Sequence, residues 1–132
     1  KYKKIDSLVI NANELKHEMN EREGNLIKLA KKFKAKVKTK NLSVTQGKKG
    51  AFIVDHKNII TKSPAFASDP VDKIGAGDAF LSLLSLCQYK KYSTEFSLFL
   101  SSLAAAKSAN TIGNKEPISK RDVLKTILHL LK

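Results

Sequence analysis

The chain has 132 residues, which suits one domain, and its 25 Lys and Arg residues against 12 Asp and Glu residues give a formal net charge of +13. Hydrophobic residues make up 42% of the chain, which excludes a disordered charged tail, and no apolar run is long enough to predict a membrane span. The single cysteine, Cys87, excludes an intrachain disulfide and a zinc site built from several cysteines. We therefore expect a reducing, cytoplasmic compartment and no membrane partner.

The positive charge is concentrated in residues 28–62, which contain eleven lysines and one acidic residue. Such a lysine stripe attracts nucleic acid, so a basic nucleic-acid-binding domain is one hypothesis. However, only Arg22 and Arg121 among the 25 basic residues are arginines, and proteins that read bases and phosphates rely on arginine. We prefer a solvated, lysine-rich surface and expect no nucleic-acid partner.

The first elements predicted along the chain are a strand and two helices. A mostly apolar run predicts a strand over residues 5–10. A polar helix is expected over residues 14–23, ended by Gly24, and an amphipathic helix over residues 26–33. A strand, a helical segment and a second strand in succession favour parallel pairing of the two strands through a crossover.

Strands and then helices fill the rest of the chain. Three strands with two turns between them are expected, the strands over residues 42–45, 51–54 and 59–61 and the turns over residues 46–50 and 56–58. Three helices follow, expected over residues 76–89, 94–109 and 119–131. The order predicts an α/β fold in which helices cover an open, partly parallel sheet, with the last helix packed on the sheet.

The strongest chemical signal lies between Asp72 and Phe80, where Gly75-Ala76-Gly77-Asp78 stands at the mouth of a predicted helix. Glycines here remove side chains from the place where backbone N–H groups converge, so the segment predicts an anion hole at the positive end of a helix dipole. A carboxylate beside such a hole suits a general base for an attacking hydroxyl during phosphoryl transfer. The alternative is an ordinary glycine loop in which Asp78 only complements the helix dipole.

Residues 71–80 closely resemble the C-terminal signature of ribokinase-like carbohydrate kinases. Three further segments match the family in order. Asn11-Ala12-Asn13-Glu14 is similar to an Asn-x-x-Glu motif, residues 44–51 resemble a Thr-x-Gly-x-x-Gly strand–turn, and residues 101–113 resemble an alanine-rich helix and glycine turn. The flanks of the signature look most like the heptose-7-phosphate kinase branch.

The resemblance implies the C-terminal half of a three-layer α/β/α fold, with a partly parallel sheet, a β-hairpin and covering helices. Residues 1–132 would be the nucleotide-side portion of a kinase domain whose N-terminal half is absent. The implied activity is ATP-dependent phosphorylation of a sugar or sugar-phosphate hydroxyl. We expect the fragment to be inactive alone, with a second copy or a complementing N-terminal half as its protein partner. The alternative is a nucleotide- or phosphate-binding module without catalysis of its own.

The resemblance also implies roles for individual residues. Asp78 would be the base, and the amides of Gly75, Ala76 and Gly77 would form the anion hole. The residues near ATP would be Thr45, Gly47, Gly50, Ser102 and Gly113. The metal-site residues would be Asn11 and Glu14 for Mg²⁺, mostly through water, and Asp72 with the Ile74 carbonyl for a monovalent cation such as K⁺. The chain departs from the family pattern at Lys73, where threonine is usual, and at Ser102, where many members have asparagine.

Overall fold

A four-stranded mixed sheet forms the middle layer of the structure, a computed structural model that describes residues 5–67, 74–110 and 119–130. The strands lie in sequence order and are β1 (Ile5–Asn11), β2 (Thr39–Thr45), β3 (Ala51–Val54) and β4 (Ile60–Ser63). β1 pairs with β2 in parallel, whereas β3 is antiparallel to both of its neighbours. The predicted parallel pair and β-hairpin are therefore confirmed.

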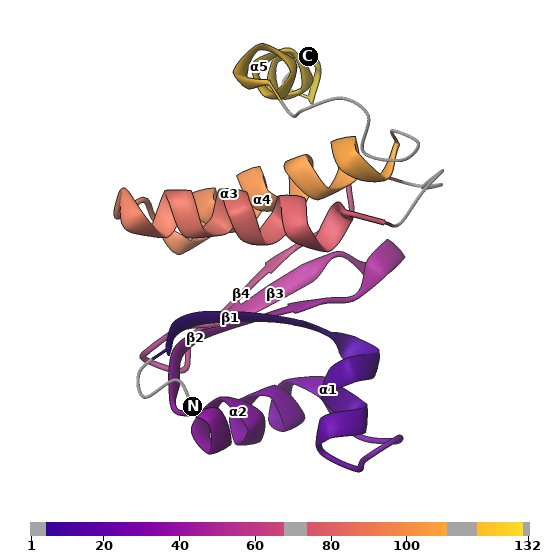
Figure 1. The fold of residues 1–132 in the computed structure, drawn as a ribbon, viewed down its shortest axis with the longest axis vertical. Helices are drawn as coiled ribbons and strands as arrows, with labels where there is room; N and C mark the ends of the chain where they lie inside the picture. The colour runs from indigo at the N-terminus through magenta and orange to yellow at the C-terminus, as the bar shows by residue number, and fades with distance from the viewer. Residues whose placement is uncertain (1–4, 68–73, 111–118, 131–132) are drawn as a thin grey trace.

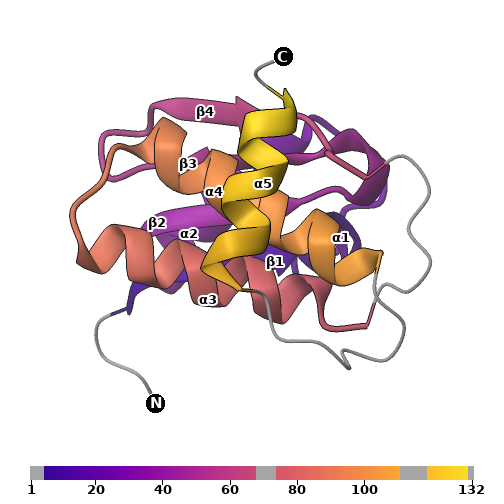
Figure 2. The same ribbon diagram turned by 90° about the horizontal axis from the view of Figure 1, so that it is seen from above.

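Helices cover both faces of this sheet (Figure 1). One face carries α1 (Ala12–Glu18) and α2 (Leu26–Val37), and the other carries α3 (Ala76–Tyr89) and α4 (Thr94–Ala109). The fifth helix, α5 (Lys120–Leu130), crosses the outer surface of α3 and α4 (Figure 2). The prediction that the last helix packs on the sheet is wrong, because α3 and α4 already occupy that face.

The helices and strands differ from their predicted bounds mainly in the first half of the chain. α1 ends at Glu18 instead of reaching residue 23, since Met19 caps it and Asn20 has a left-handed φ of 51°. Only Leu15 of this helix is buried, so no apolar repeat supports a longer one. α2 continues to Val37 instead of ending at residue 33, and β2 begins three residues earlier than expected.

Alternation along the strands builds two cores, one on each face of the sheet. The core under α1 and α2 contains Leu15, Leu29, Phe33, Leu42, Val44, Phe52 and Val54. The core under α3 and α4 contains Ala51, Ile53, Phe80, Leu84 and Leu98. Burying one large apolar side chain contributes about 1.5–3 kcal/mol. Phe80 therefore fixes the first turns of α3 against the sheet, and with them the glycine segment that precedes it.

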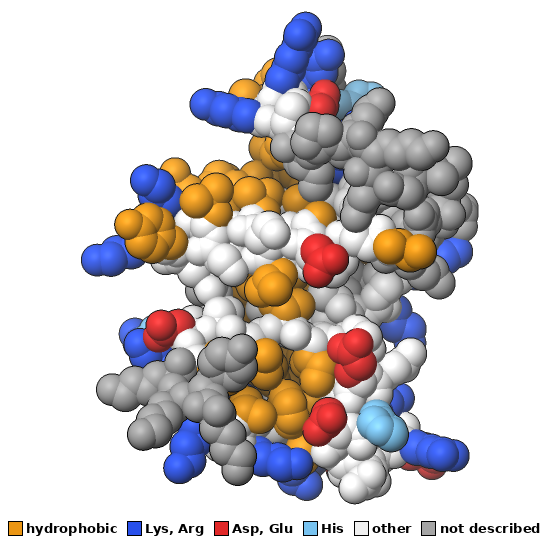
Figure 3. All heavy atoms as spheres, viewed as in Figure 1, with side chains coloured by type: hydrophobic (Ala, Val, Ile, Leu, Met, Phe, Trp, Pro, Cys, Tyr) orange, Lys and Arg blue, Asp and Glu red, His pale blue; other side chains and the backbone are white. Residues whose placement is uncertain are grey.

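The two edges of the sheet are built differently. β4 has four residues, among them the exposed Lys62, and is followed directly by Pro64, which has no N–H to donate. β1 has seven residues and, among the described strands, pairs only with β2. Figure 3 shows hydrophobic side chains on the face that displays β1 and α3, both above and below that strand.

No described helix combines the length and the apolar composition that a membrane span requires.

Candidate functional site

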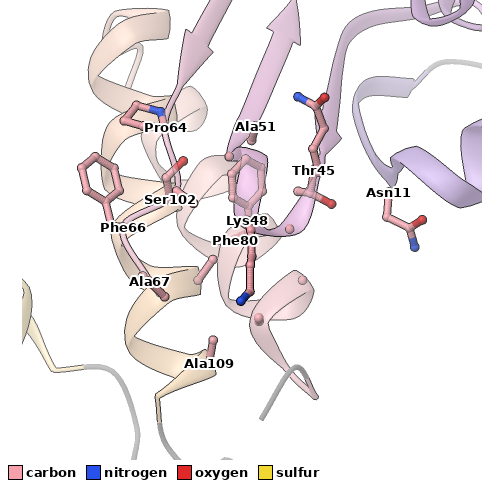
Figure 4. Close-up of a pocket in the computed structure, with 18 of the residues that line it drawn as sticks. Asn11, Thr45, Lys48, Ala51, Pro64, Phe66, Ala67, Phe80, Ser102 and Ala109 are labelled. Carbon is pink, nitrogen blue, oxygen red and sulfur yellow. The ribbon is translucent and has the colours of Figure 1, made fainter. Parts of the chain in front are cut away.

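The candidate site lies where the two parallel strands end. Asn11 is the last residue of β1 and Thr45 the last of β2, and the two are partners in the strand register. A cavity of about 580 Å³ opens beside them (Figure 4). Its walls come from the β1–α1 junction, the β2–β3 turn, residues 64–67, the start of α3 and the second half of α4. In α/β proteins ligands bind at the carboxyl ends of parallel strands, and this volume is that of a small-molecule pocket.

The N-terminus of α3 forms one wall of the cavity. Gly75 is its N-cap residue, with a left-handed φ of 84° and no side chain to cap the helix. The Ala79 amide makes the first bond of the helix, donating to the Gly75 carbonyl at 2.9 Å. The amides of residues 76–78 precede that bond, and Ala76 and Gly77 line the cavity. No side chain of the described residues caps these amides, which together with the helix dipole favour an anion at this end of the pocket.

Asp78 occupies the first turn of the same helix. Its side chain is exposed and is not part of the cavity wall. The carboxylate is therefore adjacent in sequence to the amides at the start of α3, but it is exposed to solvent and does not line the cavity. This placement suits a group that exchanges a proton with a molecule approaching from outside the cavity.

The turn between β2 and β3 forms a second wall. The Gln46 amide donates to the Gly50 carbonyl at 2.8 Å, and the Gly50 amide donates to the Gly47 carbonyl at 3.0 Å. Both glycines have left-handed φ values, 58° for Gly47 and 84° for Gly50. A Cβ atom on Gly50 would overlap the Ser63 carbonyl oxygen, whereas one on Gly47 would meet nothing within 4 Å. Glycine at position 50 is therefore required by the close approach of β4.

The wall made by α4 is mainly apolar. Ala105, Ala106 and Ala109 present small side chains, and Phe66, whose ring packs edge-to-face against Phe99 of the same helix, also lines the cavity. These small side chains and the aromatic ring form an apolar slot that suits a flat, largely apolar group.

Ser102 is the polar residue in this slot. Its side chain is only 7% exposed, and its hydroxyl has no hydrogen-bond partner within the described part of the chain. By contrast, Ser97 and Ser101 of the same helix donate to the carbonyls of Ser93 and Ser97 at 2.8 and 2.6 Å. A buried hydroxyl without a partner is costly, so the one on Ser102 is suited to a ligand atom.

Asn11 and Glu14, the residues expected to hold Mg²⁺, are engaged in capping α1. The Asn11 side-chain oxygen accepts from the amides of Asn13 and Glu14, each at 2.9 Å, and Glu14 Oε2 accepts from the Asn11 amide at 3.0 Å. The described residues contain no group of three His, Cys, Asp or Glu side chains placed to hold a metal. This donor set suits Mg²⁺, which keeps several waters and needs few protein ligands.

The structure brings most of the predicted site residues to one cavity. The residues that line it are Asn11, Thr45, Gly47, Gly50, Ala76, Gly77 and Ser102. Glu14, Gly75, Ile74 and Asp78 lie outside the wall, and Ile74 is 74% exposed. Asp72 and Gly113 are outside the described residues.

Several residues of the wall have no assigned role in the sequence analysis, among them Lys48 and Phe66. Lys48 stands between the two glycines of the turn, but so does Lys49, so the sequence alone does not single it out. Phe66 follows Pro64 in a segment without a regular pattern, so nothing local indicates its orientation.

Comparison with known proteins identifies the family. The pfkB family carbohydrate kinase profile matches residues 2–121. Bifunctional protein HldE from Campylobacter fetus subsp. fetus (strain 82-40) is 33% identical over 86 residues, which are 65% of this chain and 18% of the relative.

Solved structures agree with this match. Ribokinase from Thermotoga maritima is 28% identical with a TM-score of 0.77 and covers 94% of this chain and 42% of its own. Arabidopsis thaliana ribokinase, solved with ribose and ATP, is 25% identical with a TM-score of 0.80 over 92% of this chain and 40% of its own. The chain thus spans about two fifths of the length of these solved relatives, and its fold corresponds to part of the ribokinase fold. With a family profile matched over most of its length, the chain belongs to the pfkB family of carbohydrate kinases.

Proposed function

We propose that this chain is the nucleotide-binding, base-bearing portion of a kinase that uses ATP to phosphorylate a hydroxyl of a sugar or sugar phosphate. The observation that carries the proposal is the convergence of separate motifs on one cavity. Residues from the end of β1, the glycine turn after β2, the start of α3 and the second half of α4 all line it. These segments are far apart in sequence, and each resembles a motif of the family to which the chain belongs.

The two ends of the cavity suit the two parts of ATP. The alanine surface of α4, Phe66 and the unpartnered Ser102 hydroxyl would receive the base. The amides at the start of α3 would receive the phosphates, because they present N–H groups to an anion, and the glycine turn would let the phosphates approach its backbone closely. The Arabidopsis relative was solved with ATP and ribose, which supports this pair of substrates.

The proposed chemistry places Asp78 as the general base. Its carboxylate takes the proton of the substrate hydroxyl while that oxygen forms a bond to the γ-phosphorus of ATP. The bond from the γ-phosphorus to the β–γ bridging oxygen breaks, and ADP leaves with the electron pair. The amides of residues 75–77 stabilise the charge on the transferring group. Mg²⁺, when bound near Asn11 and Glu14, would neutralise phosphate charge, with Glu14 Oε1 or water as the contact since Oε2 is engaged in the cap.

The rest of the catalytic machinery is proposed to come from outside residues 1–132. The solved relatives are more than twice as long, and we place their additional sugar-binding portion beside β1. The isolated chain should bind nucleotide and fail to phosphorylate sugar, because positioning supplies most of the rate in phosphoryl transfer. A K⁺ ion near Asp72 and the Ile74 carbonyl, a cytoplasmic location, and a second copy as alternative partner belong to the same proposal.

A non-catalytic nucleotide-binding module is the second candidate. The observation that favours it is the place of Asp78 in the first turn of α3, where a carboxylate also complements the helix dipole without contacting a ligand. The two candidates predict different results when Asp78 is replaced in a chain that also has the sugar-binding portion. Only the kinase should then lose sugar-dependent release of ADP.

Calorimetric titration with Mg-ATP tests the site. Gly77→Val places its side chain where nothing lies within 4 Å, so the variant should fold and yet obstruct the cavity. Ser85→Val, at an exposed position of the same helix, is the matched control. We expect saturable one-to-one binding by the unaltered chain and the control, and none by Gly77→Val. If both variants bound Mg-ATP equally well, the nucleotide-binding site would not be this cavity.

Catalysis requires a second experiment, in which the chain is joined to the uncovered portion of a relative such as the Thermotoga ribokinase. Sugar-dependent release of ADP should then appear and should be lost in Asp78→Asn. Activity that persists in Asp78→Asn would favour another base. A turnover of about 1–100 per second by the isolated chain would contradict its assignment as a portion of the enzyme.

A further inference from the structure

The apolar slot beside α4 has a single kind of polar group in its side chains. Ala105, Ala106 and Ala109 line it with methyl groups, and Phe66 lines it with an aromatic ring. Ser102 adds a hydroxyl to the same surface (Figure 4). Among the described residues of the slot, this hydroxyl is therefore the side-chain group able to bond the edge of a base.

Other polar residues of the wall lie away from the slot. Asn11 and Thr45 are the last residues of β1 and β2, and Figure 4 shows them on the other side of the cavity from Ser102 and Phe66. They face the part of the cavity proposed for the phosphates. How the slot distinguishes one base from another thus depends, among these side chains, on Ser102.

The Ser102 hydroxyl has no fixed direction. A serine in a helix can donate to the carbonyl four residues before it, and Ser97 and Ser101 do so at 2.8 and 2.6 Å. Ser102 does not, because its hydroxyl has no hydrogen-bond partner within the described part of the chain, although its side chain is only 7% exposed. No group in that part of the chain therefore determines whether this oxygen donates its hydrogen or accepts one.

A hydroxyl without a fixed direction can bond two kinds of purine. It has one hydrogen to donate and lone pairs that accept, and rotation selects between them. Adenine presents an amino donor at its sixth ring position, whereas the 6-oxo purines present a carbonyl acceptor there. A group able only to donate, placed here, would leave the adenine amino group unpaired. Unpaired buried polar groups are what make a site reject an analogue.

We propose that the slot accepts 6-amino and 6-oxo purine nucleotides alike. The Ser102 hydroxyl accepts from the amino group of the first class and donates to the carbonyl of the second. The inference rests on the proposed function, because it concerns the base of the nucleotide in the same cavity. It extends the phosphate donors of the kinase from ATP to its 6-oxo counterpart ITP.

Calorimetric titrations with Mg-ATP, Mg-ITP and Mg-CTP test the proposal. The three nucleotides share the ribose and the triphosphate, so differences between them come from the base. The dissociation constants of Mg-ATP and Mg-ITP should agree within about threefold, since neither base loses the hydrogen bond. That of Mg-CTP should be at least about tenfold higher, because the smaller ring buries less apolar surface in the slot.

Variants of two adjacent serines show whether the hydroxyl is responsible. Ser102→Ala should weaken Mg-ATP and Mg-ITP by the same factor, about three- to tenfold, the net value of one neutral hydrogen bond. Ser101→Ala is the matched control, because it removes a buried hydroxyl that is bonded to its own helix, and it should change neither affinity. Circular dichroism checks that both variants are folded.

A difference of more than about threefold between Mg-ATP and Mg-ITP in the unaltered chain would overturn the proposal and leave nucleotide binding intact. In Ser102→Ala, a loss confined to one of the two nucleotides, or no loss, would also overturn it, since the hydroxyl would then have a fixed direction or no contact with the base. Equal affinity for all three nucleotides and for inorganic tripolyphosphate would contradict the proposed function as well, because the slot would not receive the base. If none of these ligands binds to the folded chain, both are wrong.

Discussion

Asn11 and Glu14 cap each other across the first turn of α1. The Asn11 side-chain oxygen accepts from the Glu14 amide at 2.9 Å, and Glu14 Oε2 accepts from the Asn11 amide at 3.0 Å. This reciprocal pair is a capping box, which satisfies amides that a helix start leaves without partners. The pair expected to hold Mg²⁺ therefore also has a structural role, and the two roles have to be separated by the choice of substitution.

Asn11→Ala should lower the free energy of unfolding by about 1 kcal/mol, the usual loss for an N-cap. Glu14→Gln keeps an oxygen for the Asn11 amide and should cost much less. If the carboxylate also serves Mg²⁺, Glu14→Gln should reduce the difference in ATP affinity between solutions with Mg²⁺ and with EDTA. Urea unfolding and calorimetry measure the two effects. An unchanged Mg²⁺ dependence in Glu14→Gln would leave capping as the only role of this residue.

Substitutions of the two turn glycines should differ in cost. Gly47→Ala meets no atom within 4 Å and has only to adopt a left-handed φ, at about 1–2 kcal/mol. Gly50→Ala has the same backbone penalty and also overlaps the Ser63 carbonyl, so it should be clearly more destabilising. Urea midpoints of the two variants make the comparison. Equal midpoints would mean that β4 moves away without cost.

Ser102→Ala should change stability and ligand affinity in opposite directions. It removes a buried hydroxyl that has no partner, so the free energy of unfolding should stay the same or rise by up to about 1 kcal/mol. If the hydroxyl bonds the base, ATP affinity should fall about three- to tenfold, the net value of one neutral hydrogen bond. Ser97→Ala, whose hydroxyl donates to Ser93, is the control and should leave ATP affinity unchanged. If Ser102→Ala kept the same ATP affinity, this hydroxyl would not bind the ligand.

The stability of the fold should respond to Cys87 at alkaline pH. Burial raises the pKa of this thiol above its ordinary value. Between the unfolded and the folded pKa values, the folded chain holds a proton that the unfolded chain has released. The contribution is thus complete below the unfolded pKa and decreases as the pH rises above about 8.5. Urea unfolding from pH 7 to pH 10 should show the free energy of unfolding decreasing, and the decrease should be smaller in Cys87→Ala. Identical pH profiles of the two proteins would contradict a raised pKa of this thiol.

The helices and strands that were correctly predicted have strong local signals. α3 and α4 have the predicted bounds, because a glycine segment and Ser93 start them and continuous apolar content supports them. The end of α1 was not predictable from composition, since the polar residues after Glu18 are compatible with helix and only the left-handed Asn20 ends it. The position of α5 depends on which face is already covered, which no local pattern encodes.

The candidate site also contains some residues that the sequence predicts and others that it does not. Motifs with glycines, such as those at Gly47 and Gly77, are visible in sequence because they mark backbone that approaches a ligand. Lys48 was not predicted because it lies in a chain of many exposed lysines, and only the turn geometry separates it from Lys49. The availability of the Ser102 hydroxyl could not be predicted either. It follows from the comparison with Ser97 and Ser101, whose hydroxyls bond to their own helix.

The unequal edges of the sheet limit how copies of this chain can assemble. Within the described strands, the seven-residue β1 has a strand partner on one side only, whereas β4 is short, carries Lys62 and is followed by Pro64. A strand that pairs with β1 covers that edge of the sheet and leaves the β4 edge facing solvent. Edge-to-edge pairing between two copies therefore ends with a symmetric pair, because neither copy has a second receptive edge from which a filament could grow.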